Sequence, residues 1–333
     1  MSFSKRMSRI KPSGIRAVQK RIAGKSDMIS FAAGLPDPAL YPLEDLRKAA
    51  DTMLEKEGAT AFAYGLTKGY GPLLDYLTDR MNNREHVECT KENICILSGS
   101  QQGLGLAAMT FLDEGDVVIT ENPSYLGAIN AFRPYGAEFV GVDTDDDGIV
   151  IEDLERALEE NPKTKLIYVI PNFQNPTGKA WTLERRERFM EVVAKYDVAV
   201  VEDNPYGDLR FKGEPLPHLR ALDKKGQVIY LGSFSKILSP GMRVAWTCAS
   251  KEVATAFESL KETNDLQSPE LTQMLTYYYL KMFDLEKHIE EIQVVYKERC
   301  ELMVEMIQKY FPAEIKYTDP EGGMFLWLEL PEG

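Results

Sequence analysis

Short apolar runs alternate with amphipathic segments along the first 250 residues of the chain. Runs typical of buried strands, several of them ending in polar residues, occupy 93–99, 116–125, 137–143, 164–178, 197–207 and 227–236. Segments with apolar residues at helical spacing lie between them, at 100–112, 126–133, 151–160 and 182–196. Strands and helices that alternate at these lengths are typical of an α/β fold, so we predict a doubly wound, mostly parallel, mixed sheet.

The pattern changes after about residue 250. Residues 251–265 and about 270–310 predict long helices, and the closing stretch GGMFLWLELPEG, residues 322–333, predicts an apolar strand. We therefore expect a large domain over 41–265 and a smaller α/β domain built from both chain ends, 1–40 and 266–333.

Composition and charge exclude several classes of protein. The chain has 39 Lys and Arg against 52 Asp and Glu, a net charge of −13, and no dense basic run, which argues against a nucleic-acid partner. The four cysteines and three histidines are widely scattered, so neither a disulfide framework nor a metal centre is expected. No secretory signal and no apolar run of about 18 residues occurs, which excludes a membrane span and favours a cytoplasmic protein.

Polar side chains follow five of the predicted strands. In doubly wound sheets ligands bind beyond the carboxyl ends of the strands, so these side chains are the first candidates for a functional site. They are Ser98 to Gln101, Tyr125, Asn175, Asp203 to Tyr206, and Ser233 to Lys236.

Lys236 lies in SFSKILSPGMR, directly after an apolar run and seven residues before Arg243. Taken alone, the stretch is equally typical of a surface turn. A lysine buried beside hydroxyls and a cation can instead lose its proton and attack a carbonyl to form a Schiff base. An aldehyde cofactor such as pyridoxal phosphate would then need a phosphate cradle, an anion at its ring nitrogen, a donor at its ring oxygen and a stacking surface.

The chain offers a candidate for each of these needs. Ser100 and Gln101 in the first turn of a helix, with Ser233, Ser235 and Arg243, are suited to a phosphate dianion.

The ring has candidates of its own. Asp203 could keep the ring nitrogen protonated, Asn175 and Tyr206 could donate to the ring oxygen, and Tyr125 could stack on the ring. Each residue alone is also typical of a turn, a helix cap or core packing, but together on successive strand ends they favour the cofactor site.

Long collinear stretches resemble one known family. The chain is similar to the fold-type I, pyridoxal-phosphate-dependent aminotransferases of class I/II, and most similar to their 2-aminoadipate and kynurenine aminotransferase branch. The matching stretches are FAAGLPDPALYP, YGLTKGYGPLLDYL, LSGSQQGL, ENPSYLG, PNFQNPTG, VEDNPYG, GSFSKILSPGMRVAW and EGGMFLW.

The resemblance implies a role for each candidate. Lys236 would bond to the cofactor, with Asp203 and Tyr125 as further catalytic residues. Tyr64 would reach the phosphate in the neighbouring subunit of a homodimer. Arg16, Gly34 and Asn175 would line the substrate side.

The reaction implied by the resemblance is ping-pong transamination between an L-amino acid and a 2-oxo acid. The branch suggests 2-oxoglutarate as acceptor and 2-aminoadipate, aromatic or branched-chain amino acids as donors. Two alternatives stay open: another reaction of the same cofactor, such as C–S lysis or cyclisation, and a non-enzymatic, ligand-sensing homologue.

The chain also departs from the family pattern. Family members continue beyond LWLELPEG and supply an arginine for the substrate α-carboxylate, and we find no equivalent of that arginine here. We expect a truncated small domain, the other possibility being that Arg16 and Asn175 hold the carboxylate.

Overall fold

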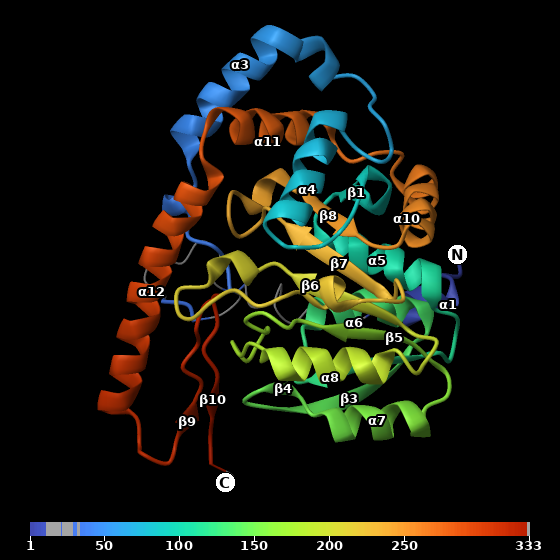
Figure 1. The fold of residues 1–333 in the computed structure, drawn as a ribbon, viewed down its shortest axis with the longest axis vertical. Coiled ribbons are helices and arrows are strands. Elements are labelled where there is room, and N and C mark those ends of the chain that lie inside the picture. Colours follow the sequence, from blue (N-terminus) through green and yellow to red (C-terminus); the bar gives the residue numbers. More distant parts are fainter. Residues whose placement is uncertain (11–20, 22–28, 32–33, 332–333) are drawn as a thin grey trace.

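A mixed sheet of eight strands forms the centre of the computed structural model, which describes residues 1–333 except 11–20, 22–28, 32–33 and 332–333 (Figure 1). The strand order is β1-β8-β7-β6-β5-β2-β3-β4. Strands β3, β2, β5, β6 and β7 are parallel, while β8 is antiparallel to both of its neighbours and β4 is antiparallel to β3. The strands are β1 (Ile94–Leu97), β2 (Val117–Asn122), β3 (Glu138–Asp145), β4 (Gly148–Ile149), β5 (Thr164–Val169), β6 (Ala199–Asn204), β7 (Val228–Ser233) and β8 (Ala245–Cys248).

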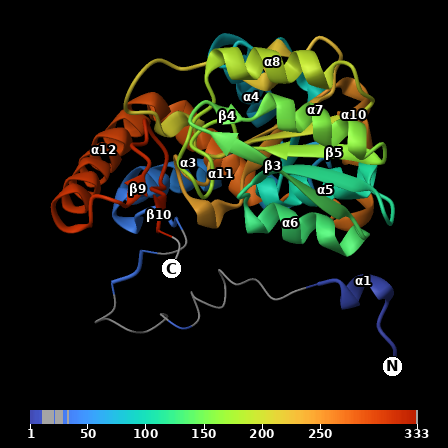
Figure 2. The ribbon, with the colours of Figure 1, turned by 90° about the horizontal axis from the view of Figure 1, so that it is seen from below.

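Helices cover both faces of this sheet, which explains why its central strands are continuous apolar runs. Apolar residues of α5, α6 and α10 share one buried cluster with the sheet, and those of α7, α8 and α9 share another. Figure 2 shows α5 and α6 on one side of the sheet and α7 and α8 on the other. The bounds are α5 (Ser100–Phe111), α6 (Leu126–Phe132), α7 (Ile151–Glu160), α8 (Leu183–Val193), α9 (Leu219–Leu222) and α10 (Lys251–Asn264).

A third group of helices packs against one end of the sheet. A buried cluster joins apolar residues of α3, α4, α11 and α12 to Tyr230 of β7 and Trp246 of β8. The long helix α12 runs down one edge of the molecule beside the hairpin β9–β10 (Figure 1). The remaining bounds are α1 (Lys5–Ser8), α3 (Leu43–Ala61), α4 (Gly71–Asn83), α11 (Glu270–Met282), α12 (Leu285–Tyr310), β9 (Lys316–Tyr317) and β10 (Leu328–Glu329).

The doubly wound, mostly parallel sheet expected from the sequence is confirmed, and so are the helices between its strands. The long apolar strand predicted over 322–333 is wrong, because within the described part of that stretch only Leu328–Glu329 is a strand. The residues before it pack as a loop instead: a side chain at Gly322 or Gly323 would collide with Phe173, and the ring of Phe325 meets the ring of Tyr206 edge-on at 5.3 Å. The division into 1–40, 41–265 and 266–333 stays a prediction.

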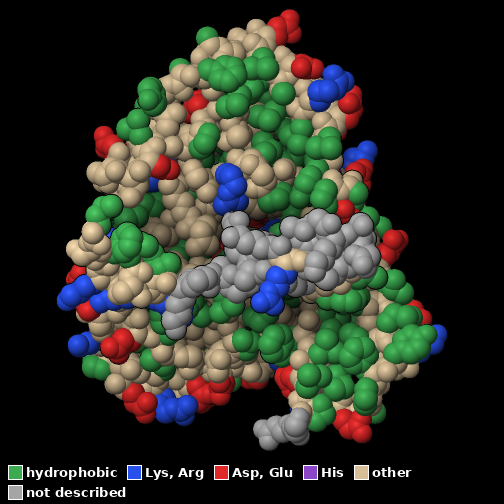
Figure 3. Space-filling view, turned by 180° about the vertical axis from the view of Figure 1, so that it is seen from behind, with side chains coloured by type: hydrophobic (Ala, Val, Ile, Leu, Met, Phe, Trp, Pro, Cys, Tyr) green, Lys and Arg blue, Asp and Glu red, His purple; other side chains and the backbone are tan. Residues whose placement is uncertain are grey.

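Hydrophobic side chains also gather on the surface, as the view from behind shows (Figure 3). Large apolar residues that directly follow α3 are strongly exposed, with Phe62 at 74%, Tyr64 at 86% and Leu66 at 72%.

Within the described ranges, no helix combines the length and apolar character that crossing a membrane requires.

Candidate active site

Three neighbouring parallel strands carry the centre of the site at their carboxyl ends. Asn175 lies in the loop after β5, Asp203 lies near the end of β6, and Lys236 follows β7. Strand β6 pairs in parallel with β5 on one side and β7 on the other, with Asp203 opposite Leu231. The carboxyl ends therefore meet at one edge of the sheet, where the sequence predicts the site.

The amine of Lys236 is enclosed by groups from distant parts of the chain. Its Nζ donates to the Gly34 carbonyl oxygen at 3.2 Å and lies 5.8 Å from the centre of the Tyr206 ring. Burial, together with the charge of Arg243, lowers the pKa of Lys236 to about 8, although the charge of Asp203 opposes the shift. A substantial fraction of this amine is therefore neutral and nucleophilic near pH 8.

The carboxyl of Asp203 is buried, with one oxygen bound and one left over. Its Oδ2 accepts from the Tyr168 hydroxyl at 2.9 Å, whereas its Oδ1 has no hydrogen-bond partner among the described residues. Burial raises the pKa of Asp203 to about 6, while the Tyr168 hydrogen bond and the charge of Lys236 oppose the increase. Because buried polar atoms normally have partners, the free oxygen marks a place for a ligand donor.

Asn175 and Tyr206 also come together, as the sequence analysis expects. The Asn175 side-chain amide donates to the Tyr206 hydroxyl at 3.2 Å. Tyr125, half-buried, stands directly before the first residue of α6 and packs against the same buried cluster as Tyr206. A phenol and an amide thus border the space near Lys236, and a second phenol packs against the same buried cluster.

A second group of candidates surrounds the start of α5. Gly99 has φ +84°, and a Cβ there would lie 1.9 Å from Nη2 of Arg243, so only glycine lets the guanidinium approach. Arg243 itself has φ +56° and donates to the Ser98 carbonyl at 3.3 Å. The Ser100 hydroxyl is buried and has no partner in the described part of the chain. Free helix N–H groups, a guanidinium and an unused hydroxyl are a donor set suited to an anion.

The other predicted phosphate residues lie where the sequence places them, at the end of β7, directly after it and in α5. The Ser233 hydroxyl donates to Ser235 Oγ at 2.9 Å and accepts from the Ser235 backbone N–H at 3.0 Å. The exposed Gln101 donates through its side chain to the Gly127 carbonyl at 3.0 Å, which ties α5 to α6.

A family model described as "Aminotransferase class I and II" matches residues 26–333. The chain belongs to this aminotransferase family. This aminotransferase is 41% identical to aromatic-amino-acid aminotransferase 1 of Thermococcus litoralis, over 99% of its own length and 80% of that protein. It is 39% identical to the 2-aminoadipate transaminase of Thermus thermophilus, over 100% of its own length and 82% of that protein.

Solved structures of aminotransferases also resemble this chain. The crystal structure of Pyrococcus horikoshii kynurenine aminotransferase, in complex with PMP and with KYN and KYA as substrates and products, superposes on this aminotransferase with a TM-score of 0.94. The two chains are 40% identical, and the match covers 99% of this chain and 82% of the other.

The residues of this aminotransferase fit pyridoxal phosphate at two separate points. A pyridine nitrogen that carries a proton would satisfy the free Oδ1 of Asp203, and a phosphate oxygen would satisfy the free hydroxyl of Ser100. The lowered pKa of Lys236 adds an amine able to react with the aldehyde of the same molecule.

The roles expected for two further residues stay predictions. Tyr64 is 86% exposed, so its expected contact with a neighbouring subunit stays a prediction. Arg16 lies outside the described residues. Gly34, in contrast, lies next to Lys236 through its carbonyl oxygen.

Sequence reasoning missed two residues that hold the site together. Tyr168, the hydrogen-bond partner of Asp203, lies inside an apolar run and reads as ordinary core. Glu121 is buried and accepts from the Ile170 backbone N–H and the Trp181 indole N–H, both at 2.9 Å. Glu121 thereby ties the end of β2 to the start of the loop that carries Asn175, and an isolated Glu in a strand gave no signal of this.

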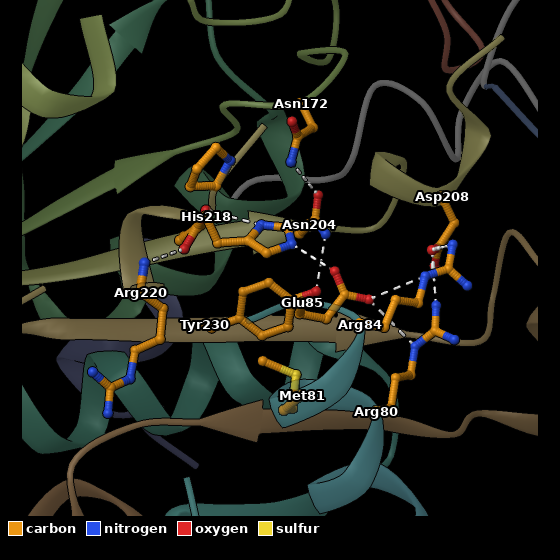
Figure 4. A network of polar contacts seen from close by, with 12 residues as sticks. Arg80, Met81, Arg84, Glu85, Asn172, Asn204, Asp208, His218, Arg220 and Tyr230 are labelled. Atoms are coloured by element: carbon orange, nitrogen blue, oxygen red, sulfur yellow. Dashed lines mark hydrogen bonds and ion pairs between the residues drawn. The ribbon is translucent and has the colours of Figure 1, made fainter. Parts of the chain in front are cut away.

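Behind β6, a polar network faces away from Asp203. Strand alternation turns Glu202 and Asn204 to the face opposite Asp203. Asn204 donates to the Tyr230 hydroxyl at 2.9 Å and accepts from the Asn172 amide at 2.8 Å (Figure 4). These bonds tie Asn204, the residue after Asp203, to β7 and to the loop after β5.

His218 is a buried cation of this network, as is Arg80. Its ring lies 2.8 Å from a Glu85 oxygen and 3.4 Å from a Glu202 oxygen. Burial alone would lower the pKa of His218, but the hydrogen bonds and charges of Glu202 and Glu85 outweigh it and raise the pKa to about 9. The protonated ring therefore stabilises the fold fully below the unfolded pKa of 6.5, and this stabilisation is lost as pH rises through 9.

Replacing His218 by asparagine should destabilise the protein strongly at pH 6, because Glu202 and Glu85 lose a paired cation and only Glu85 keeps others, Arg80 and Arg84. From the shift of His218, the difference in free energy of unfolding between wild type and variant should narrow by about 3 kcal/mol as pH rises to 9.5. Urea unfolding of both proteins at several pH values measures this difference in free energy. The exposed His86, at φ +53°, gives the matched control His86→Asn. A difference in free energy of unfolding that stays constant from pH 6 to about 9.5 would contradict the assignment of His218 as a protonated, stabilising group.

Proposed function

We propose that this aminotransferase uses pyridoxal phosphate, bonded to Lys236, to transfer an amino group between an L-amino acid and a 2-oxo acid. The observation that carries the proposal is the enclosed Lys236 amine beside a buried Asp203 oxygen that lacks a partner among the described residues. An ordinary surface turn would have neither.

The residues around Lys236 and at the start of α5 would hold the two ends of the cofactor. When bound, the cofactor supplies an aldehyde carbon and a ring that accepts electrons. Asp203 would keep a proton on the ring nitrogen, Asn175 and Tyr206 would donate to the ring oxygen, and Tyr125 would stack on the ring. The phosphate would bind the donors already described: Ser100, Gln101, Ser233, Ser235 and Arg243.

Lys236 would also move protons at the substrate Cα. A general base works best when its pKa lies near the working pH, and burial brings the pKa of Lys236 to about 8. The Gly34 carbonyl accepts a hydrogen bond from this amine, which supports a place for Gly34 on the substrate side. Gly34, Asn175 and Arg16 are the residues we place against the substrate.

We further propose a homodimer in the cytoplasm. The exposed apolar residues Phe62, Tyr64 and Leu66 offer a surface for a second copy, with Tyr64 reaching the partner's phosphate. All four cysteines are free, which is typical of a reducing compartment.

For substrates, we propose 2-oxoglutarate as acceptor and aromatic amino acids, 2-aminoadipate or branched-chain amino acids as donors. The support comes from the relatives in Thermococcus and Thermus, named for aromatic amino acids and for 2-aminoadipate.

A panel of donors tests this function. We expect glutamate to form only when donor and 2-oxoglutarate are both present, with parallel lines in double-reciprocal plots. Release of pyruvate and ammonia from a sulfur amino acid without any acceptor would favour a lyase instead and contradict the proposal.

A further inference from the structure

Lys261 of α10 is a fully buried cation that the proposed function leaves unused. Its Nζ donates to Gln102 Oε1 and Ser268 Oγ, both at 3.1 Å, and to the Asp265 carboxylate at 3.2 Å. Lysine is rarely buried unless its charge is paired, and here Asp265 pairs it. The amine thus joins α5, the end of α10 and the turn before α11.

Two of these partners hold a single residue, Ser98. Gln102 Oε1 also accepts from the Ser98 backbone N–H at 2.8 Å, and the Ser98 hydroxyl donates to Ser268 Oγ at 3.1 Å. The third polar group of Ser98, its carbonyl, accepts from Arg243. The backbone N–H and the side chain of Ser98 therefore both depend on groups that Lys261 organises.

Ser98 directly precedes the proposed phosphate cradle. Gly99 is in a left-handed conformation against Arg243, and Ser100 begins α5 with a buried hydroxyl that has no partner in the described ranges. A shift of Ser98 would move the first N–H groups of α5 and the Ser100 hydroxyl together. The charge of Lys261 is balanced by Asp265, so its effect on the cradle is geometric.

The turn after α10 is itself under strain. Leu266 has φ +65°, which is unfavourable for a residue with a Cβ, and its N–H bonds to the Lys261 carbonyl at 3.0 Å. The neighbouring Gln267 accepts from the Gly65 backbone N–H through its side-chain oxygen. Contacts on both sides thus hold this turn in a conformation that the chain alone disfavours.

We propose that Lys261 is a positioning residue for the cofactor phosphate: through Gln102, Ser268 and Ser98 it sets the geometry of the cradle at Gly99 and Ser100. This inference rests on the proposed function, since it requires that pyridoxal phosphate binds there.

The test compares pyridoxal phosphate with pyridoxal, which lacks the phosphate. Cofactor-free wild type and Lys261→Met are titrated with each compound, and the absorbance change on bonding to Lys236 gives the dissociation constant. We expect the variant to bind pyridoxal phosphate about tenfold more weakly, the effect of losing one charge-assisted hydrogen bond, and to bind pyridoxal as the wild type does. Equal weakening for both compounds, or none for either, would overturn the positioning role.

The exposed Lys251 in the same helix gives a matched control, because its side chain is 68% exposed and pairs only with Glu92 in the described structure. Lys251→Met should leave both dissociation constants unchanged. If the wild type bonds neither compound at Lys236, the proposed function itself fails, and that result is separate from the outcome for Lys261.

A second variant covers the case in which Lys261→Met does not fold. Ser268→Ala removes one link to Ser98 and leaves Lys261 paired with Asp265. We expect a smaller loss, about threefold, again confined to pyridoxal phosphate. Where both single variants fold, the double variant should lose less than the product of the two single losses, because both act through Ser98. The proposal would be overturned if the losses of the two single variants multiply in the double variant. It would also be overturned if Ser268→Ala keeps the wild-type preference for pyridoxal phosphate over pyridoxal.

Discussion

Lys236→Ala will abolish transamination. The variant loses both the amine that bonds to the cofactor and the group that moves the substrate proton. A positioned general base alone contributes up to about 10⁴-fold, so we expect kcat to fall by at least that factor. The assay is glutamate formation from 2-oxoglutarate, together with borohydride reduction and mass spectrometry of the peptide that contains residue 236.

Lys212→Ala is the control for this experiment. Lys212 pairs with Asp319 on the surface, and we assign it no part in the site. Its variant should keep the activity and one reduced cofactor label per chain, on the peptide of Lys236. Turnover at the wild-type rate in Lys236→Ala, or a label that stays on another lysine, would refute the assignment.

Asp203→Asn should be nearly as damaging. The asparagine side chain keeps the shape and can still accept from Tyr168, but it cannot hold a proton on the ring nitrogen as a carboxylate does. Losing an electrostatic group aimed at developing charge costs about 10² to 10³-fold in kcat. Steady-state assays at saturating cofactor measure the loss.

A cofactor analogue with carbon in place of the ring nitrogen provides the control. With that analogue, wild type and Asp203→Asn should show the same residual rate, because Asp203 then has no partner to protonate. A difference that persists with the analogue would mean that Asp203 acts through the fold of β6 and not through the ring nitrogen.

Most of the site could be predicted because its residues follow strands. Asn175, Asp203 and Lys236 each stand after or near the end of an apolar run, and parallel strands bring such ends to one edge of the sheet. The prediction of a strand over 322–333 is wrong because apolar residues of this stretch form a packed loop instead. The Phe325 ring contacts the Tyr206 ring, and the paired strand is confined to Leu328–Glu329.

The residues that position the site gave no comparable signal. Tyr168 and Glu121 lie within strands, and Lys261 lies in a helix with many charged neighbours, so each reads locally as core or surface. Their roles depend on contacts with residues 35, 49 and 159 positions away in the chain, which no local pattern records.

The order of polar and apolar residues alone determined the α/β alternation, the helix that begins at Ser100 and the polar side chains at the strand ends, because these follow from local periodicity. Only the tertiary structure decided that the Lys236 amine meets the Gly34 carbonyl, that one buried oxygen of Asp203 has no partner among the described residues and that Lys261 lies behind the proposed phosphate cradle. Burial and charge at a point in space are set by segments distant in sequence, and these quantities give an ordinary lysine and an ordinary aspartate their chemistry.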